Sequence, residues 1–595
     1  MTKLKTNNFR VHAAEQLHES LFEAEDTKYY VFAGRPEAWD NEAVPPVPGD
    51  SVRETEFNIY DTMVFGKAVS QSDVAFMVPH YPWVQGQVFA QYDDHDEDLH
   101  DKNFFVTVDN TTEYHVFKCL NNNRNSPSTV PPQRTETAED DIYYSTSDGY
   151  QWKYLYSIPL SVYRKFAVSG HVPVIENANT TGNAVPGAID VILVEEPGSR
   201  YNSYASGYFT EIAVSGDTTV YGIDPTSSAN TDFYKECAIK IVEGAGEGQQ
   251  RQIAEYSVQG GFKRIWLTQP FAELPTSTSR YEITPNVRIE GDGSGCVARA
   301  IIDSTSNTVS HIEITDRGAN YSYAMAEVVG NTGIITSNNS LVEANTAVLR
   351  PVLGPAGGHG SDINSELGAT ALGFSVTFAN TEQLTIPVEG KIRQIGLIKD
   401  PMFANVELTL SNIEGSFTDE EEVFAIGANA KGISSYFNEP TAVLRLSNVF
   451  SGFAAGQVVQ GAVSNAHATI DSIRISGTQK NFDTFDQRIR LDTTFNGSVP
   501  FQPGERVRQE ITNAQAVVHE SNTSFTALTQ LRGVLNITDP ESAQYLSSET
   551  AVANVNAIVS GDLVKASGKA LYIENVQPVT RGPNLSETIK FIIRF

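Results

Sequence analysis

The sequence predicts a mainly β fold of the α+β type, with several domains and a discontinuous core domain formed by the N- and C-terminal parts of the chain. Short alternating strands separated by Gly, Ser, Thr and Asn dominate from residue 177 onward. Two sets of internal repeats lie in that part, which predicts inserted domains resembling small β-sandwiches or β-barrels. The last residues, 587–595, alternate apolar and polar side chains to the end and need a sheet to enter.

The composition limits the classes of function. A chain of 595 residues is too long for one core and predicts three to five modules of roughly 150 residues. Its 42 Lys and Arg against 72 Asp and Glu give a formal charge of -30, which repels nucleic acid and anionic bilayers. Apolar residues make up 40%, enough to order the chain. We therefore expect a globular protein with an acidic surface and no nucleic-acid partner.

The cysteines and the apolar runs indicate the compartment in which the chain folds and whether it spans a membrane. Cys119, Cys237 and Cys296 are far apart and predict neither a disulfide framework nor a metal knuckle, which fits folding in a reducing cytoplasm. No apolar run reaches eighteen residues, and the first ten residues lead into no apolar signal segment. We expect no membrane span.

The N-terminal part begins with a helix and a strand. Phe9, Ala13, Leu17 and Leu21 recur every fourth residue, which predicts a short amphipathic helix. The apolar run from residue 29 predicts a strand that ends in a Gly and Pro turn at residues 34–39. The partner-contact candidates in this turn are Arg35, Pro36 and Trp39. Trp39 ranks first, because an exposed aromatic anchor contributes more binding energy than a run of charges.

An acidic run follows at residues 93–101. Its candidates for partner contact are Asp93, Asp94 and Asp96. The run lacks the spacing of a calcium loop and the His pair of a zinc helix, so a solvated acidic loop is expected instead of a metal site.

The stretch 148–159 is the most aromatic of the chain. Asp-Gly opens it, Pro159 closes it, and one face carries Trp152, Tyr154, Tyr156 and Ile158. The pattern predicts a core strand with a more mixed second face. The alternative is a stacking platform for bases or sugars, which needs a basic surround that the chain does not supply.

Repeats organise the rest of the chain. Residues 189–207 and 312–330 echo each other as a strand, a Gly turn and a Tyr-Ser-Tyr group, and the glycines of 244–248 predict a hairpin because a strand pattern follows them. A second family aligns 417–433, 453–469 and 501–517 without gaps. Its shared core positions are Val423, Val459 and Val507, followed seven residues later by Ala430, Ala466 and Ala514.

Chemistry-bearing motifs are few. The loop 355–362 contains His359 and Ser361 among glycines, but no partner carboxylate or G-x-S-x-G nucleophile can be placed beside it. We expect a tight turn in which Ser361 or Asp362 caps a helical turn through Glu366. No catalytic, cofactor-binding or metal residue is predicted, and no cofactor.

The predicted domains follow from these patterns. Residues 1–176 and 346–404 are expected to form the core domain with the C-terminal part, 536–595. The intervening segments, 177–345 and 405–535, are expected as β insertions, the second with three repeats. The last strand is expected to pair inside the N-terminal module and to close the domain that contains the aromatic strand.

Five stretches together resemble a known family: 32–39, 116–120, 148–159, 392–401 and 571–575. In this order they are similar to the baseplate wedge subunit of T-even-type contractile-tailed phages, the gene-product-eight family. The resemblance covers about the first 175 residues, pieces between 357 and 402, and the last 35, whereas the β insertions depart from the shorter T-even form. It implies a non-enzymatic virion protein of the tail baseplate, assembled in the host cytoplasm, that homodimerises and contacts other wedge proteins.

Two alternatives stay open. A host-attachment protein would bind cell-surface glycans through exposed aromatics of the insertions, for which the candidates are Tyr201, Tyr204, Tyr321 and Tyr323. A glycoside hydrolase would need two carboxyl groups about 5 or 6.5 to 9.5 Å apart in a cleft.

Overall fold

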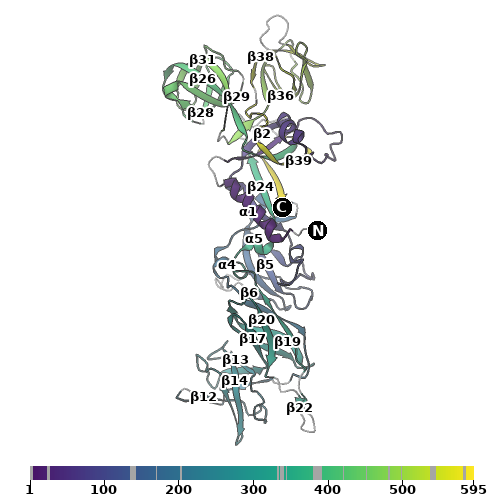
Figure 1. Cartoon of the computed structure of the whole chain (residues 1–595), viewed down its shortest axis with the longest axis vertical. Helices are drawn as coiled ribbons and strands as arrows, with labels where there is room; N and C mark the ends of the chain where they lie inside the picture. Colours follow the sequence, from purple (N-terminus) through teal and green to yellow (C-terminus); the bar gives the residue numbers. More distant parts are fainter. Residues whose placement is uncertain are drawn as a thin grey trace. The chain divides into compact units, whose positions relative to one another are not determined.

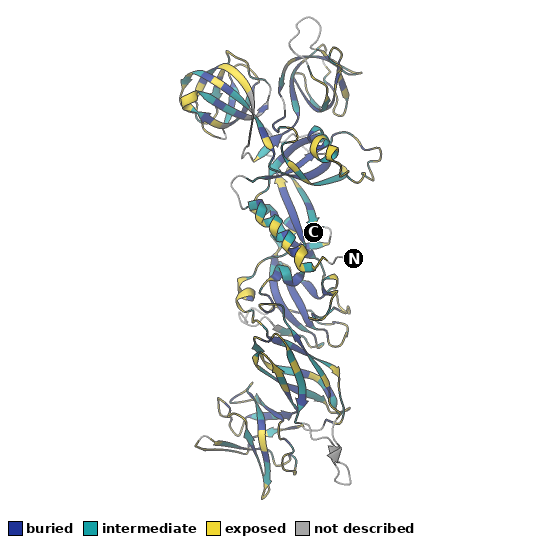
Figure 2. Ribbon diagram, viewed as in Figure 1, coloured by how far each residue is buried: buried dark blue, intermediate teal, exposed yellow. Residues whose placement is uncertain are grey.

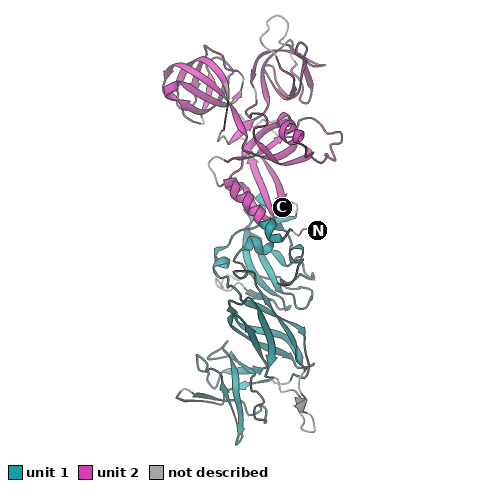
Figure 3. Cartoon of the chain, viewed as in Figure 1, with its two compact units in different colours: residues 1–11, 78–369 teal, residues 12–77, 370–595 magenta. Residues whose placement is uncertain are grey.

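The computed structural model divides the chain into two compact units (Figure 3). Unit 1 comprises residues 1–11 and 78–369, and unit 2 comprises 12–77 and 370–595. The structure describes residues 5–22, 27–134, 143–168, 170–201, 204–216, 218–330, 334–335, 341–342, 345–379, 391–419, 421–450, 452–479, 483–497, 499–535, 545–559, 561–580 and 585–595.

The mainly β, multi-domain fold is confirmed (Figure 1). The described α-helices are α1 (Asn7–Phe22), α2 (Ile59–Thr62), α3 (Leu160–Phe166), α4 (Ala178–Gly182) and α5 (Ile363–Leu367). None of them is long and apolar enough to cross a bilayer.

Unit 2 is centred on a sheet built from distant parts of the sequence. Its order is β32-β2-β1-β25-β39. The strands are β1 (Tyr29–Gly34), β2 (Met63–Ala68), β25 (Lys391–Lys399), β32 (Thr484–Asp486) and β39 (Lys569–Thr580). Phe32 lies opposite Gly396, and Gly396 lies opposite Ile573. A Cβ at Gly396 would stand 2.4 Å from the Phe32 ring, so only glycine fits between these strands.

A second sheet of unit 2 contains the chain's last strand. β40 (Glu587–Arg594) pairs with β24 (Ala371–Phe378), which pairs with the segment 74–77 of β3 (Val74–Pro79). Phe591 stacks on Phe374 at 4.8 Å and on Tyr572 of β39 at 4.7 Å between ring centroids. The prediction that the terminal strand enters a sheet is confirmed, but its direct partner is β24, and the N-terminal strand β3 lies one strand further along the sheet.

Helix α1 forms, but its buried face differs from the expected one (Figure 2). Ala14 and Leu21 are buried and Leu17 packs beside them, whereas Phe9 is 58% exposed. A strict spacing of four drifts by about 40° at each step around a helix with 3.6 residues per turn. The buried face therefore follows spacings of three and four, and Phe9 falls outside it.

Two closed barrels occupy residues 402–559 of unit 2. The first has the order β26-β29-β28-β27-β30-β31, with β26 (Met402–Glu414), β27 (Glu422–Ala425), β28 (Lys431–Asn438), β29 (Val443–Phe450), β30 (Val458–Gly461) and β31 (His467–Gln479). The second has the order β33-β36-β35-β34-β37-β38, with β33 (Ile489–Phe495), β34 (Arg506–Gln509), β35 (Ala514–Ser521), β36 (Phe525–Arg532), β37 (Tyr545–Ser547) and β38 (Val552–Val559).

Each barrel consists of two copies of a three-strand unit, and three of these four copies are the repeats recognised in the sequence. The third repeat pairs with a fourth copy, β36 to β38, in which Leu546 and Ala553 are seven residues apart and fully buried. Val507 and Ala514 occupy the equivalent places in the third copy. The boundary expected at residue 535 therefore falls inside the second barrel, next to residues 536–544, which lie outside the described part.

Unit 1 contains the aromatic strand in a sheet of order β4-β5-β7-β6. The strands are β4 (Phe105–Asp109), β5 (Glu113–Asn121), β6 (Tyr143–Ser145) and β7 (Gln151–Pro159). The burial expected for the aromatic face is confirmed, but the other face is buried too, including Lys153. The terminal strand β40 belongs to unit 2, so the expectation that it closes the domain of β7 is wrong. The predicted domain 1–176 is divided at residue 77, where the composition does not change.

The remainder of unit 1 forms two larger sheets. The seven-stranded one has the order β10-β16-β13-β14-β15-β12-β11, with β10 (Ala205–Tyr208), β11 (Glu211–Ser215), β12 (Thr218–Gly222), β13 (Ala238–Glu243), β14 (Gln250–Gln259), β15 (Phe262–Leu267) and β16 (Arg280–Thr284). The six-stranded one has the order β19-β18-β17-β20-β23-β9, with β9 (Ile189–Glu196), β17 (Asn286–Gly291), β18 (Ser294–Asp303), β19 (Thr308–Ala319), β20 (Ala324–Val329) and β23 (Val348–Leu353). Short pieces are β8 (His171–Pro173), β21 (Ile334–Ile335) and β22 (Leu341–Val342).

These sheets explain the repeats of residues 189–330. The two echoing segments begin with β9 and β19, which are the two edge strands of the six-stranded sheet. The glycines of 244–248 lie in the turn between the antiparallel strands β13 and β14, as predicted.

Candidate functional site

The turn predicted to contact a partner is a packed corner of unit 2. Trp39 is only 8% exposed, and its indole Nε1 donates to the carbonyl of Val576 at 3.1 Å. The guanidinium of Arg35 lies 3.8 Å from the indole ring, and the buried Pro36 offers its carbonyl to Arg393. The exposed position assumed for Trp39 is therefore wrong, because neighbouring strands cover the ring.

The acidic loop is held by basic side chains instead of being only solvated. Asp93 accepts from Arg350 at 2.6 Å, and Asp96 accepts from Lys102 at 2.6 Å. The hydrogen bond from Arg350 lowers the pKa of the Asp93 carboxyl. Asp94 lies 3.7 Å from the same guanidinium. Within the described ranges, no group of three or more His, Cys, Asp or Glu side chains is arranged to hold a metal ion.

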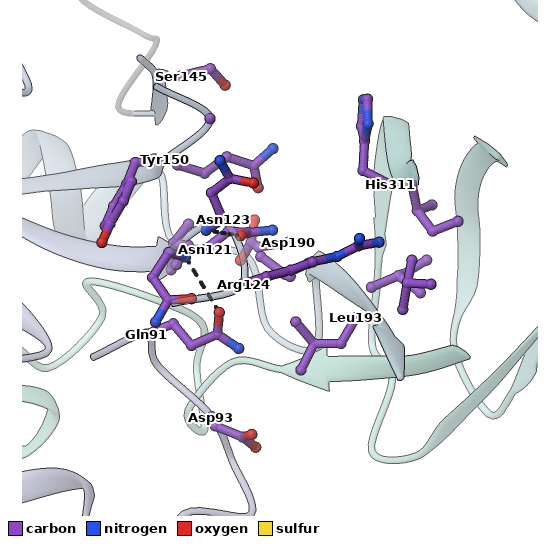
Figure 4. A pocket seen from close by; sticks show the side chains of 18 of the residues that line it. Gln91, Asp93, Asn121, Asn123, Arg124, Ser145, Tyr150, Asp190, Leu193 and His311 are labelled. Atoms are coloured by element: carbon purple, nitrogen blue, oxygen red, sulfur yellow. Dashed lines mark hydrogen bonds between the residues drawn. The ribbon is translucent and has the colours of Figure 1, made fainter. Parts of the chain in front are cut away.

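Asp93 and Asp96 line a cavity of about 1080 Å³ in unit 1, which is the candidate functional site (Figure 4). Its walls come from the ends of β5 and β7, the acidic loop, and the edge strands β9 and β19. This volume slightly exceeds the range of about 300–1,000 Å³ that ligand pockets have. Charged residues of the lining are Asp93, Asp96, Lys102, Arg124, Asp190, Glu195, Glu313, Arg317 and Arg350.

An unusual turn projects into this cavity after β5. Asn123, Arg124 and Asn125 have φ values of 49°, 58° and 58°, three consecutive left-handed residues without glycine. Such a conformation costs roughly 1–2 kcal/mol per residue and persists only where surrounding bonds hold it. Asn123 donates to the carbonyl of Asp148 at 2.9 Å, and the Asn122 side chain donates to Asn125 at 2.8 Å.

The turn places the guanidinium of Arg124 at the edge of β19. Arg124 Nη2 donates to the carbonyl of Ser310 at 2.5 Å. Figure 4 shows its side chain reaching toward the strands that carry Leu193 and His311. The bonds that hold the turn thus place the Arg124 guanidinium within the cavity.

A network of buried charges lies behind the cavity wall. Lys118 Nζ lies 2.5 Å from Glu366 Oε1 and 2.6 Å from His359 Nδ1. Because an ammonium only donates, His359 Nδ1 accepts, and the ring proton is on Nε2, 3.4 Å from the Asp190 carboxylate. Asp190 belongs to both the network and the cavity lining.

The electrostatics of this network are strongly perturbed. Burial lowers the pKa of the Lys118 ammonium and, together with Lys118, that of His359. Burial opposes ionisation of Glu366, but the neighbouring ammonium outweighs it and holds the pKa of the carboxyl well below its usual range. Burial also lowers the pKa of Lys153 to about 8, against the attraction of Asp190. The network joins β5, β9 and α5 inside unit 1.

The sequence predicted the helical turn that carries Glu366, one member of this network. The prediction that Asp362 caps a helical turn is confirmed, since its side chain accepts from the Ser365 amide at 3.1 Å. The role of Glu366 beside Lys118 was missed. A lysine inside the apolar run 116–120 was the available signal, because a charge in a buried strand needs a partner.

The tyrosines proposed for glycan binding do not form one surface. Tyr201 and Tyr321 are 1% and 8% exposed, and the Tyr201 hydroxyl accepts from the Ala347 amide at 2.8 Å. Tyr204 and Tyr323 are 54% and 57% exposed. The glycan alternative is thus wrong for the first pair, whose rings fill the core of the six-stranded sheet, and stays a prediction for the second.

Comparisons with known proteins do not assign the chain. It matches no model of a known protein family, and no curated protein is found to match it. The cavity, the buried charge network and the arrangement of the sheets are therefore the grounds on which function is argued.

Proposed function

We propose that the chain is a structural subunit of a contractile phage tail, a baseplate wedge protein that homodimerises and holds neighbouring wedge proteins, without enzymatic activity. One observation carries the proposal. The stretches that resemble the wedge family are distant in sequence but adjacent in the fold: residues 32–34 pair with 394–396, which pair with 573–575. Likewise, 116–119 pairs with 152–156 in the aromatic sheet. A shared scaffold requires this adjacency, because the core of a fold is where its packing is most constrained.

The segments that depart from the family support the same reading. The stretch 402–559 forms two closed barrels, and most of 189–353 forms two sheets with their own cores. A closed barrel satisfies its own backbone and can be inserted in a loop without disturbing the host sheet. We infer that these modules are additions to a wedge scaffold.

The mechanism is the burial of surface between subunits. Since Trp39 is covered, contacts are expected on exposed apolar side chains of the inserted modules. In the seven-stranded sheet these include Tyr208 and Phe262. Large exposed side chains of this kind are typical anchors of protein interfaces.

The proposal is tested on virus particles. Antibodies raised against the full chain should label the tail tip of contractile-tailed particles in electron micrographs, and preimmune serum should label nothing. Sedimentation equilibrium of the purified chain should give twice the monomer mass. Label confined to capsids, or a strictly monomeric chain at micromolar concentration, would contradict the proposal.

A further inference from the structure

Strand β11 is an edge of the seven-stranded sheet in unit 1. It pairs with β12 from Glu211 opposite Gly222 to Ser215 opposite Thr218. In the described part of the chain no strand lies on its other side, since β11 ends the strand order of the sheet. An edge of this kind presents backbone N–H and C=O groups that can pair with another chain.

The hairpin of β11 and β12 extends past the neighbouring strand of the sheet. β12 pairs with β15 at Tyr221 and Gly222, whereas its residues 218–220 pair with β11 alone among the described strands. Residues 213–215 and 218–220 therefore form a two-stranded ribbon, which has little stability by itself. A further strand on β11 would give this ribbon a third member and stabilise it.

The hydrogen bonds of the sheet show which backbone groups of β11 point outward. The Ile223 amide donates to the carbonyl of Lys263 in β15 at 2.9 Å, and the bonding direction alternates from one residue of a strand to the next. Gly222 and Val220 therefore direct their backbone groups at β11. The Thr210 amide donates to the Gly222 carbonyl at 2.9 Å, which agrees with this direction.

The outward residues of β11 are Ile212 and Val214. Glu211, Ala213 and Ser215 lie opposite the residues of β12 that bond toward β11, so the backbone groups of the two residues between them point to the open edge. The Val214 side chain is 59% exposed, whereas Ile212 packs partly against the core of the sheet. Pairing at this edge would thus cover an exposed apolar side chain as well as backbone groups.

The sequence of β11 does not block such pairing. Natural edge strands are commonly blocked by charged residues, by proline or by a bulge. β40, an edge strand of unit 2, carries Lys590 and Arg594, whereas β11 contains no lysine, arginine or proline. Its one charged residue is Glu211, which accepts from Arg264 at 2.8 Å. The edge is therefore open and locally neutral.

The outward pattern of β11 is complementary to itself. In an antiparallel pair centred on Ala213, Ile212 of one copy lies opposite the partner's Val214, and the reverse holds at the other end. Each of these pairs exchanges both of its backbone hydrogen bonds, and its two β-branched side chains cover each other. Glu211 lies opposite the partner's Ser215, so no like charges face each other.

We propose that β11 pairs antiparallel with β11 of a second copy of the chain, about a two-fold axis at Ala213, and joins the two seven-stranded sheets into one. A two-fold axis is the commonest symmetry of homo-oligomers. The inference rests on the homodimerisation proposed above and assigns a surface to it. A strand edge buries less than the about 800 Å² per partner of a standard interface, so we expect a dissociation constant in the micromolar range.

Cysteine crosslinking of the full chain tests the register. The two copies of Ala213 would form a non-hydrogen-bonded pair, whose Cα atoms are about 4.5 Å apart, a distance that a disulfide accepts. Oxidation of Ala213→Cys with copper phenanthroline should therefore give a covalent dimer that dithiothreitol reverses. Thr218→Cys is the matched control, since it is exposed on the same hairpin but one strand further from the axis in each copy, and it should give several-fold less dimer. The parent chain under the same oxidation gives the background from its native cysteines.

A proline substitution tests the backbone hydrogen bonds. Val214→Pro removes an outward N–H but no donor of the ladder to β12, and proline is tolerated at such edge positions. It should weaken dimerisation about tenfold or more in sedimentation equilibrium. Val214→Thr keeps the N–H and the β-branched shape and should change the dissociation constant little. Unchanged hydrogen-exchange protection of β14 shows that the sheet of each variant is folded.

The outcomes distinguish this interface from the proposed function. A dimer that persists unchanged in Val214→Pro, without a crosslink at Ala213→Cys, would overturn the pairing and leave homodimerisation standing. A parent chain that stays monomeric at high micromolar concentration would overturn both. A crosslink at Thr218→Cys as strong as that at Ala213→Cys would indicate random collision and overturn the register.

Discussion

The ammonium of Lys118 and the carboxylate of Glu366 meet where neither touches solvent. We predict that Glu366→Gln destabilises unit 1 by about 3–5 kcal/mol, because it leaves a buried cation without its counter-charge. Urea unfolding followed by hydrogen exchange of β5 measures the loss. The double variant Lys118→Met with Glu366→Leu is the control and should lose much less, since apolar replacement of both partners leaves neither of these two charges without its partner. A single variant as stable as the parent would show that the pair is not ionised.

A second prediction concerns the pH dependence of the second barrel. Burial, helped by Arg488, lowers the pKa of His519 to about 3. An unfolded histidine has a pKa near 6.5. The unfolded state therefore binds the proton first, and the stabilisation present above pH 6.5 is lost as the pH falls toward 3, by up to about 1.4 kcal/mol per pH unit.

The measurement is the denaturant midpoint of the second barrel between pH 7 and pH 4. In the His519→Gln variant, the stability of the second barrel should depend less steeply on pH, because the glutamine side chain does not titrate. Identical slopes in the parent and the variant would mean that His519 is not the titrating group.

Trp39 yields the third prediction, opposite to the role the sequence suggested. Trp39→Ala should destabilise unit 2 by about 3–5 kcal/mol, as large-to-small changes in a core do. At temperatures where the variant stays folded, its sedimentation should match that of the parent. A folded variant with altered self-association but unchanged stability would return Trp39 to an interface.

Residues were predictable from sequence where the physics is local. The cap at Asp362 depends on an amide three residues away, and the pattern around it was sufficient. The partner of Lys118 is 248 residues distant, so only the fold brings Glu366 to it. The same holds for Trp39, whose indole donates to a carbonyl 537 residues later.

At the scale of elements, the fourth copy of the barrel repeat makes a direct prediction. Ala514 and Ala553 occupy equivalent, fully buried positions in β35 and β38. Ala553→Leu and Ala514→Leu should therefore destabilise the second barrel by similar amounts, about 1–3 kcal/mol from overpacking. Ala454→Leu, at an exposed position, should change little. Thermal unfolding of the three variants decides the matter, and a neutral Ala553→Leu would reject the equivalence.

The repeats show how far a pattern reaches. Phe, Val and Ala at fixed distances revealed three copies, because packing at those positions tolerates few side chains. The fourth copy keeps the spacing of seven but has Leu546 where the others have valine. The sequence did not predict that two copies form each barrel. Strand pairing across a barrel joins residues far apart in the sequence, and the local pattern does not determine it.

At the scale of the whole molecule, charge governs self-association. Two copies of a chain with a formal charge of -30 repel each other, and salt screens this repulsion over about 10 Å at 0.1 M. We predict that the homodimer proposed above tightens as NaCl rises from 20 to 300 mM. Sedimentation at both concentrations tests it, with sucrose of matched viscosity as the control. Weaker association in salt would instead indicate that attractive ion pairs dominate the interface.

The organisation of the chain was predicted in outline. The alternating pattern of residues 587–595 correctly placed the last strand in a sheet with N-terminal residues. The crossing between units at residue 77 was not foreseen, because β3 continues through it as an ordinary strand. A change in composition reveals a boundary where the loops become rich in glycine. A boundary between units that lies inside a strand changes no composition and cannot be found in this way.

The sheet β32-β2-β1-β25-β39 of unit 2 can be completed only late in synthesis of the chain. β25 is complete about 170 residues before β39 begins, which at 5–20 residues per second takes roughly 10–35 seconds. During that interval β25 presents an unpaired apolar edge, while unit 1 can already fold. Premature termination just before β39 would thus release a chain with one finished unit and one open sheet, the form most exposed to aggregation and to cellular quality control.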